Sequence, residues 1–218
     1  MKHSGLCGSK AMAAMGITLL LAGSAIATPL ATDPNAILAW RGTQQFNAYD
    51  AGLDATLQVD VEYAVYAPSQ YEKSGTDPSS GTEYVYAYQV FNDLTGNVPV
   101  SSFSVGLDSE ADPDDIGSDA GSGTAGGTAP SASAFSGSPP TSAVWSFLGD
   151  TIDPPLTNEY SEVLVFTSPN GPQWAPATVM DSGLSDTQVL PSPVPEPATF
   201  GLLALGGVLT FLGRRRRK

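Results

Sequence analysis

The sequence predicts an all-β protein whose body is an antiparallel β-sandwich, flanked by an N-terminal signal peptide and a single C-terminal hydrophobic helix. Apolar and polar residues alternate with period two in several runs, most clearly over residues 53–67. Turn-forming Gly, Pro, Asn and Asp separate these runs. No stretch between the terminal segments has convincing helical periodicity, so we expect residues 28–190 to form one sandwich. A small barrel remains the alternative, because closure depends on strand register.

Residues 1–27 have the layout of a secretory signal peptide. Lys2 and Lys10 make a basic beginning, an apolar stretch follows, and Ala25 and Ala27 form a small-x-small cleavage site. We expect signal peptidase to cut after Ala27. The alternative is an N-terminal anchor that is retained.

The clearest strand of the body lies at residues 53–67. Leu57, Val59 and Val61 alternate there with polar residues, so one face of the strand is expected in the core and the other in water. A further strand is expected near residues 37–46.

Two more strands are expected directly after this one. In residues 83–91 the side chains of Tyr84, Tyr86 and Tyr88 alternate with further apolar ones, which favours a strand covered on both faces. Residues 98–107 alternate Phe, Val and Leu with Ser and Gly. Short turns join these runs, which predicts antiparallel pairing between neighbours.

Residues 108–142 interrupt the pattern. Their acidic start and Gly/Ser/Thr/Ala-rich continuation predict a long flexible loop or linker, because such residues bury too little apolar surface to offset ordering entropy. Strands are expected again at residues 144–148, 162–167 and 175–180.

The start of this predicted loop is a candidate calcium site. Flexible acidic loops bind Ca²⁺ through several carboxylate oxygens. The alternating acids of this loop are Asp108, Glu110, Asp112 and Asp114. The tract is not an EF-hand, since Pro113 replaces the turn glycine and Asp119 replaces the final glutamate. A solvated acidic loop without metal is the simpler interpretation, and no other cofactor is expected.

The mature body is expected to contain neither histidine nor cysteine, two residue types with reactive side chains. The only histidine and the only cysteine, His3 and Cys7, lie in the segment that signal peptidase removes. Disulfides, Ser-His and Cys-His nucleophilic pairs, and His/Cys zinc sites are therefore excluded from the body.

The body is also strongly acidic. All 22 acidic residues lie between Asp33 and Glu196, together with only two bases, Arg41 and Lys73, so this span carries a net charge of −20. Nucleic acid is therefore not an expected partner, whereas divalent cations and basic partners would be attracted.

Two ligand-related functions remain open for the body. A carboxylate-based glycoside hydrolase needs only two acids at a defined separation, but no pair stands out among Asp60, Glu62, Glu83, Asp150 and Glu162. We therefore expect a protein that is not an enzyme. A carbohydrate-binding module would use exposed aromatic rings, and Trp174 is the best candidate because its proline-rich surroundings predict a loop.

Residues 191–218 form a three-part C-terminal segment. A proline-rich lead is followed by an apolar run from Ala198 to Gly213, which is shorter than the ~20 residues of a usual spanning helix but carries no charge. The segment ends in a basic block that is expected to stay in the cytoplasm. The block consists of Arg214, Arg215, Arg216, Arg217 and Lys218.

The four residues before this apolar run are Val194, Pro195, Glu196 and Pro197. With the run and the basic block, they resemble the PEP-CTERM sorting signal over the last ~25 residues. The resemblance implies recognition by a membrane-embedded exosortase, processing near Pro-Glu-Pro, and delivery to the cell surface or extracellular matrix of a bacterium that makes exopolysaccharide. An ordinary C-terminal anchor is the alternative, since prolines also precede helices.

Overall fold

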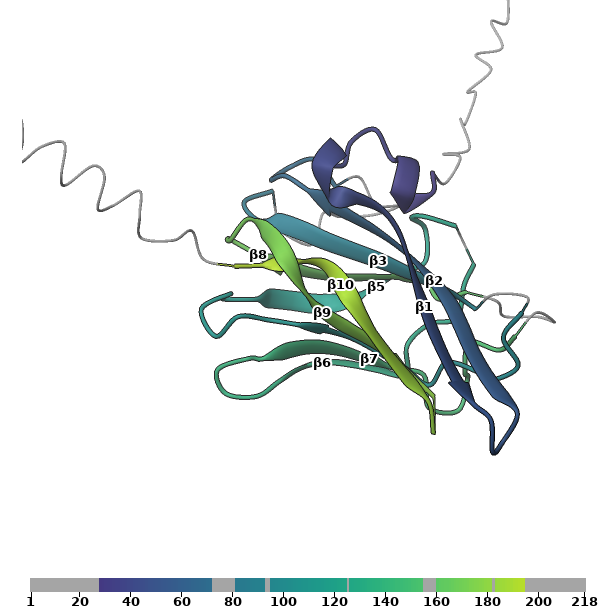
Figure 1. The fold of residues 1–218 in the computed structure, drawn as a ribbon. Coiled ribbons are helices and arrows are strands. Elements are labelled where there is room, and N and C mark those ends of the chain that lie inside the picture. Colours follow the sequence, from purple (N-terminus) through teal and green to yellow (C-terminus); the bar gives the residue numbers. More distant parts are fainter. Residues whose placement is uncertain are drawn as a thin grey trace, which may run out of the picture.

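The computed structural model describes residues 28–71, 81–92, 95–124, 126–154, 160–181 and 183–194. These residues form two five-stranded sheets, and every strand pair in both sheets is antiparallel (Figure 1). The first sheet, in spatial order, contains β1 (Arg41–Asp50), β2 (Ala55–Tyr66), β3 (Tyr84–Asn92), β8 (Val163–Ser168) and β5 (Asp114–Asp119). The second contains β10 (Ser185–Pro193), β9 (Pro172–Met180), β4 (Ser102–Gly106), β7 (Ser142–Ser146) and β6 (Ala132–Ser136). The prediction of an all-β, two-sheet body is confirmed.

The main core lies between the two sheets and follows from the alternation in each strand. Leu57, Val59 and Val61 of β2 are fully buried, as expected from their period of two. Tyr88 on β3 and Trp145 on β7 meet between the sheets with ring centroids 6.1 Å apart. The predicted core strands are therefore the ones that supply the largest buried side chains.

A second apolar cluster covers the outer face of the first sheet. Val85 and Ala87 of β3 pack there with Leu30 from the short 3-10 helix η1 (Leu30–Thr32). Arg41 holds this N-terminal segment in place, because its guanidinium donates to the backbone carbonyl of Asp33. The prediction that β3 is covered on both faces is confirmed.

The C-terminal pair β9 and β10 forms a ribbon that connects the second sheet to the first. Pairing between β4 and β9 stops after Val105 and Ala177, at Pro176, which has no N–H to donate. The N–H of Asn47 on β1 donates to the Asp186 carboxylate of β10 at 2.8 Å. Figure 1 shows the ribbon running across the two sheets. The body is a sandwich whose β1 and β10 edges are adjacent.

The prediction of one long loop over residues 108–142 is wrong in part. This segment contributes the edge strand β5 to the first sheet and the edge strand β6 to the second. Each pairs along one side only, β5 with β8 and β6 with β7. An edge strand needs less apolar surface than a central one, which is why its composition resembles a loop.

Two boundaries and one strand pairing also differ from the prediction. Residues 37–40 are not strand, because Leu38–Trp40 form the 3-10 helix η2 and β1 starts at Arg41. The strand expected at residues 98–107 is β4, which pairs with β7 and β9 in the second sheet rather than with β3. The last strand runs to Pro193, so residues 191–193, which the sequence placed in the C-terminal segment, are part of a strand of the body.

The two predicted terminal signals lie outside the described residues. These are the signal peptide at residues 1–27, with Ala25 and Ala27, and the apolar run from Ala198 to Gly213 with its basic block. Within the described part of the chain, no helix has the length and hydropathy needed to cross a membrane.

Candidate functional site

Three aromatic side chains gather at the end of the sandwich where β10 finishes. We call Trp40, Tyr63 and Trp174 the exit cluster, and this end of the body the exit end. The ring centroids of Trp40 and Trp174 are 5.0 Å apart, and those of Tyr63 and Trp174 are 5.9 Å apart with nearly perpendicular planes. Such tilted and edge-to-face arrangements are the favourable ones for aromatic pairs. Trp174 nevertheless keeps 49% of its surface exposed.

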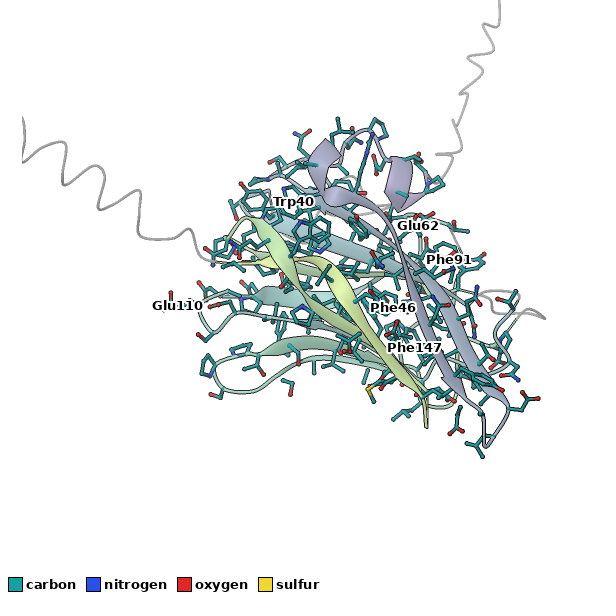
Figure 2. All side chains as sticks on the ribbon, viewed as in Figure 1. Trp40, Phe46, Glu62, Phe91, Glu110 and Phe147 are labelled. Atoms are coloured by element: carbon teal, nitrogen blue, oxygen red, sulfur yellow. The ribbon has the colours of Figure 1, made fainter. Side chains whose placement is uncertain are left out.

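Each member of the exit cluster comes from a different part of the chain. Trp40 ends η2, Tyr63 lies on β2, and Trp174 lies on β9. Figure 2 shows Trp40 beside the start of β9 and away from Phe46 and Phe147. The cluster therefore depends on the ribbon that brings β9 to the first sheet.

A glycine makes room for one of these rings. Gly42 is the cross-strand partner of Tyr63, and a Cβ atom at Gly42 would lie 2.8 Å from the Tyr63 hydroxyl oxygen. The tyrosine ring thus lies directly over the Gly42 backbone. Burial raises the pKa of the Tyr63 phenol above its usual value, so the ring stays neutral at ordinary pH.

The prediction that Trp174 lies in a loop is wrong. Its cross-strand partner in the β9–β10 ladder is Pro191. The prolines around Trp174 are typical of a loop, but prolines are also compatible with strands that lack a neighbour on one side. The partners Trp40 and Tyr63 were not predicted, although the sequence does show an aromatic residue at each of these two positions. What the sequence does not show is that the three positions meet.

The exit end is tied together by hydrogen bonds to backbone carbonyls. The N–H of Val194 donates to the carbonyl of Gly171 at 3.2 Å, so ladder-like bonding reaches the first residue after β10. The Ser192 hydroxyl donates to Gly106 at 2.6 Å, and the buried Tyr88 hydroxyl donates to Pro191. These contacts fix the point from which the chain leaves the body.

The acidic tract does not gather its carboxylates. Asp108 accepts the N–H of Glu110 at 3.0 Å within its own turn. The tract is held instead through its backbone, since the Ser168 hydroxyl and the Asn170 amide both donate to the carbonyl of Ala111. Among the described residues, which include Asp108, Glu110, Asp112 and Asp114, no three acidic side chains form a metal-binding group.

Two of the candidate catalytic acids, Glu62 and Glu162, accept hydrogen bonds from neighbouring segments. Glu62 accepts the N–H of Ala31 at 3.4 Å, and burial raises the pKa of its carboxyl above the usual value. Glu162 accepts the hydroxyl of Ser118 at 2.6 Å. In Figure 2, Glu62 and Glu110 lie on opposite sides of the body. The first contact holds the η1 segment to the first sheet, and the second joins Glu162 to the edge strand β5 of that sheet.

Comparison with known proteins identifies one feature, which lies at the C-terminal end of the chain. Residues 193–217 match the PEP-CTERM protein-sorting motif family. A search of curated proteins and a search of solved structures each found no match. The matched segment starts at Pro193, the last residue of β10, so folded body and sorting signal are contiguous. The chain therefore carries a PEP-CTERM sorting motif at its C-terminal end, and this motif implies export and sorting by an exosortase through a membrane-anchored intermediate.

Proposed function

We propose that the mature chain is a non-enzymatic interaction protein of the cell surface or extracellular matrix, associated with exopolysaccharide. The observation that carries this proposal is the direct junction between the last strand and the sorting motif. With no linker between them, the cargo that the motif delivers is the sandwich itself. Residues 28–194 contain 21 acidic and two basic residues, and the resulting net charge of −19 favours solubility in an exposed matrix.

The contacts of the buried and half-buried acids support a structural role over catalysis. Asp119 is almost fully buried and accepts hydrogen bonds from the hydroxyls of Tyr71 and Ser122, at 3.0 and 2.7 Å. Glu62 and Glu162 likewise accept bonds from neighbouring segments. Hydrogen bonds of this kind join segments of the fold, which gives these carboxylates a structural role.

Cell fractionation followed by mass spectrometry tests the proposal. We expect the wild-type protein outside the cell, beginning at Thr28 and lacking the block that starts at Arg214. In the E196A variant the basic block should be retained and the protein should stay with the membrane. Identical processing of both proteins would refute exosortase-dependent delivery. A mass above that of the trimmed chain would identify an attached glycan.

Carbohydrate binding is the second candidate function, because Trp174 presents about half of its indole to solvent. The test is retention of the mature protein on a gel that carries polysaccharide from the producing strain. Loss of retention in W174S, with retention kept in M180S, would support it. Met180 is a suitable control because it lies on the same strand and is 43% exposed.

A further inference from the structure

The folded body is separated from the predicted membrane segment by a very short tether. Val194 still donates its N–H to Gly171, and the apolar run begins at Ala198. Four residue steps span at most about 14 Å, because an extended chain covers no more than ~3.6 Å per residue. The surface around Val194 must therefore lie close to the bilayer as long as the tail is anchored.

The exit cluster is part of that surface. Trp174 is the ladder partner of Pro191, which is three residues before Val194. A strand rises ~3.3 Å per residue, which places the Trp174 backbone within roughly 11 Å of the tether's origin. Trp40 lies against Trp174, and Leu38, two residues before Trp40, is 77% exposed. The aromatic surface and the tether thus share one end of the sandwich.

The chemistry of this end suits the interfacial zone of a bilayer. Trp and Tyr rings concentrate at the level of the lipid headgroups, where the apolar ring and its polar N–H or O–H are both accommodated. The exit cluster supplies two indoles and one phenol. At the other end of β9, the exposed apolar residue is the aliphatic Met180.

The net charge of the body makes this contact selective. A body with a net charge of −19 is repelled by anionic lipid, so electrostatics disfavours every orientation that brings acidic surface to the membrane. Aromatic contact at the exit end is then the attraction that remains. The occupant is therefore a lipid headgroup interface, and zwitterionic lipid is expected to support the contact best.

We propose that the exit cluster of Trp40, Tyr63 and Trp174 seats the body on the outer surface of the membrane in the sorting intermediate, which holds Pro195, Glu196 and Pro197 between body and bilayer for the exosortase. This inference rests on the membrane-anchored intermediate of the proposed function. It assigns the cluster a partner, the lipid interface, that the sorting motif alone does not specify.

The test uses the full chain reconstituted into phosphatidylcholine vesicles that carry a nitroxide on the headgroup. Trp40 and Trp174 are two of the three tryptophans, and the third, Trp145, is fully buried in the core. We expect the quencher to remove about half of the total tryptophan fluorescence, since the two interfacial indoles are within its reach. The W40F/W174F variant should lose this quenching.

A relocated reporter provides the control. In the W40F/W174F background, M180W places an indole on the same face of β9 at its other end. We expect this indole to be unaffected by the headgroup nitroxide. Equal quenching at both positions would contradict a defined orientation.

Vesicle flotation separates the two ways in which the proposal can fail. If the full chain does not float with the vesicles, the membrane-anchored intermediate does not form, and the proposed contact between the exit cluster and the membrane is refuted with it. If the full chain floats but Trp40 and Trp174 are not quenched by the headgroup nitroxide, the tail is anchored and the contact between the exit cluster and the membrane is refuted. Protection of these indoles from aqueous iodide by polysaccharide, with no lipid quenching, would assign the cluster to glycan instead.

Discussion

Two aromatic clusters in this sandwich have similar distances between ring centroids and different exposure. In the core cluster, defined by Tyr88, Phe103, Trp145 and Phe166, the centroids of Phe103 and Trp145 are 5.8 Å apart and all four side chains are buried. In the exit cluster the corresponding distances are 5.0 and 5.9 Å, but Trp174 is half exposed. Aromatic packing alone does not distinguish core from surface site. The distinguishing feature is an indole that packs on one side and remains free on the other.

The two clusters should differ most in how much each contributes to the free energy of unfolding. Trp145 is fully buried and its indole N–H donates to the carbonyl of Gly117 at 2.9 Å. W145A should lower the free energy of unfolding by about 3–5 kcal/mol, because it leaves a large cavity. W174A should cost only about 1 kcal/mol, the value of its ring contacts. Urea denaturation measures both, and equal costs would contradict the distinction.

Alkaline pH should affect the core cluster through Tyr88. Burial raises the pKa of Tyr88 well above its usual value. A phenol whose pKa is higher in the folded state gives its full contribution to stability below about pH 10, and this contribution is lost as pH rises further. Each such phenol should add a slope of about 1.4 kcal/mol per pH unit above pH 10.

Burial is also the main cause of the raised phenol pKa values of Tyr66, Tyr71 and Tyr86. The Y88F variant should therefore reduce the slope above pH 10 without abolishing it. Urea titrations between pH 8 and 11 measure the slope. A Y88F slope equal to that of the wild type would show that Tyr88 ionises freely in the folded chain.

A smaller effect is expected from a methyl group placed under the exit cluster. G42A should displace the Tyr63 ring, because the new Cβ would lie 2.8 Å from its hydroxyl oxygen. We expect a loss of about 1 kcal/mol and a red shift in tryptophan emission as Trp174 loses its neighbour. The matched control is G117A, since a Cβ at Gly117 meets no atom within 4 Å. Identical behaviour of the two variants would mean that Tyr63 does not depend on Gly42.

The smallest effect is expected for calcium. The carboxylates of the acidic tract do not converge, and the tract is held by the Ser168 hydroxyl and the Asn170 amide. Millimolar Ca²⁺ should therefore produce no saturable heat in calorimetry on the full chain. A saturable isotherm that is lost in D108N would restore the calcium site suggested by the sequence.

The sequence was most informative about central strands and least about edges. β2 and β3 each have two hydrogen-bonded neighbours, and their alternation or dense aromatic content identified them. The three strands that were missed, β5, β6 and β10, are all edge strands. Half of an edge strand's backbone groups face away from the sheet, so acids, small residues and prolines are acceptable there. These are also the residues that predict loops.

The exit cluster was only partly predictable for a related reason. The exposure of Trp174 was anticipated from its proline-rich surroundings, whereas its partners were not. Trp40, Tyr63 and Trp174 are far apart in the chain, and they meet because the ribbon leaves the second sheet at Pro176. Local pattern carries no information about such a crossing. The sorting motif, in contrast, is a contiguous segment and was recognised directly.

The central claim is that the exit cluster contacts the membrane surface during sorting. The rate at which the tail is removed in the native cell tests this claim most directly. Pulse-chase labelling would compare W174S with M180S, which alter two exposed positions on the same strand. We predict that W174S slows conversion of precursor to trimmed protein by roughly threefold or more, because the body no longer holds the motif at the membrane. M180S should process at the wild-type rate. Equal rates for both variants would contradict the claim.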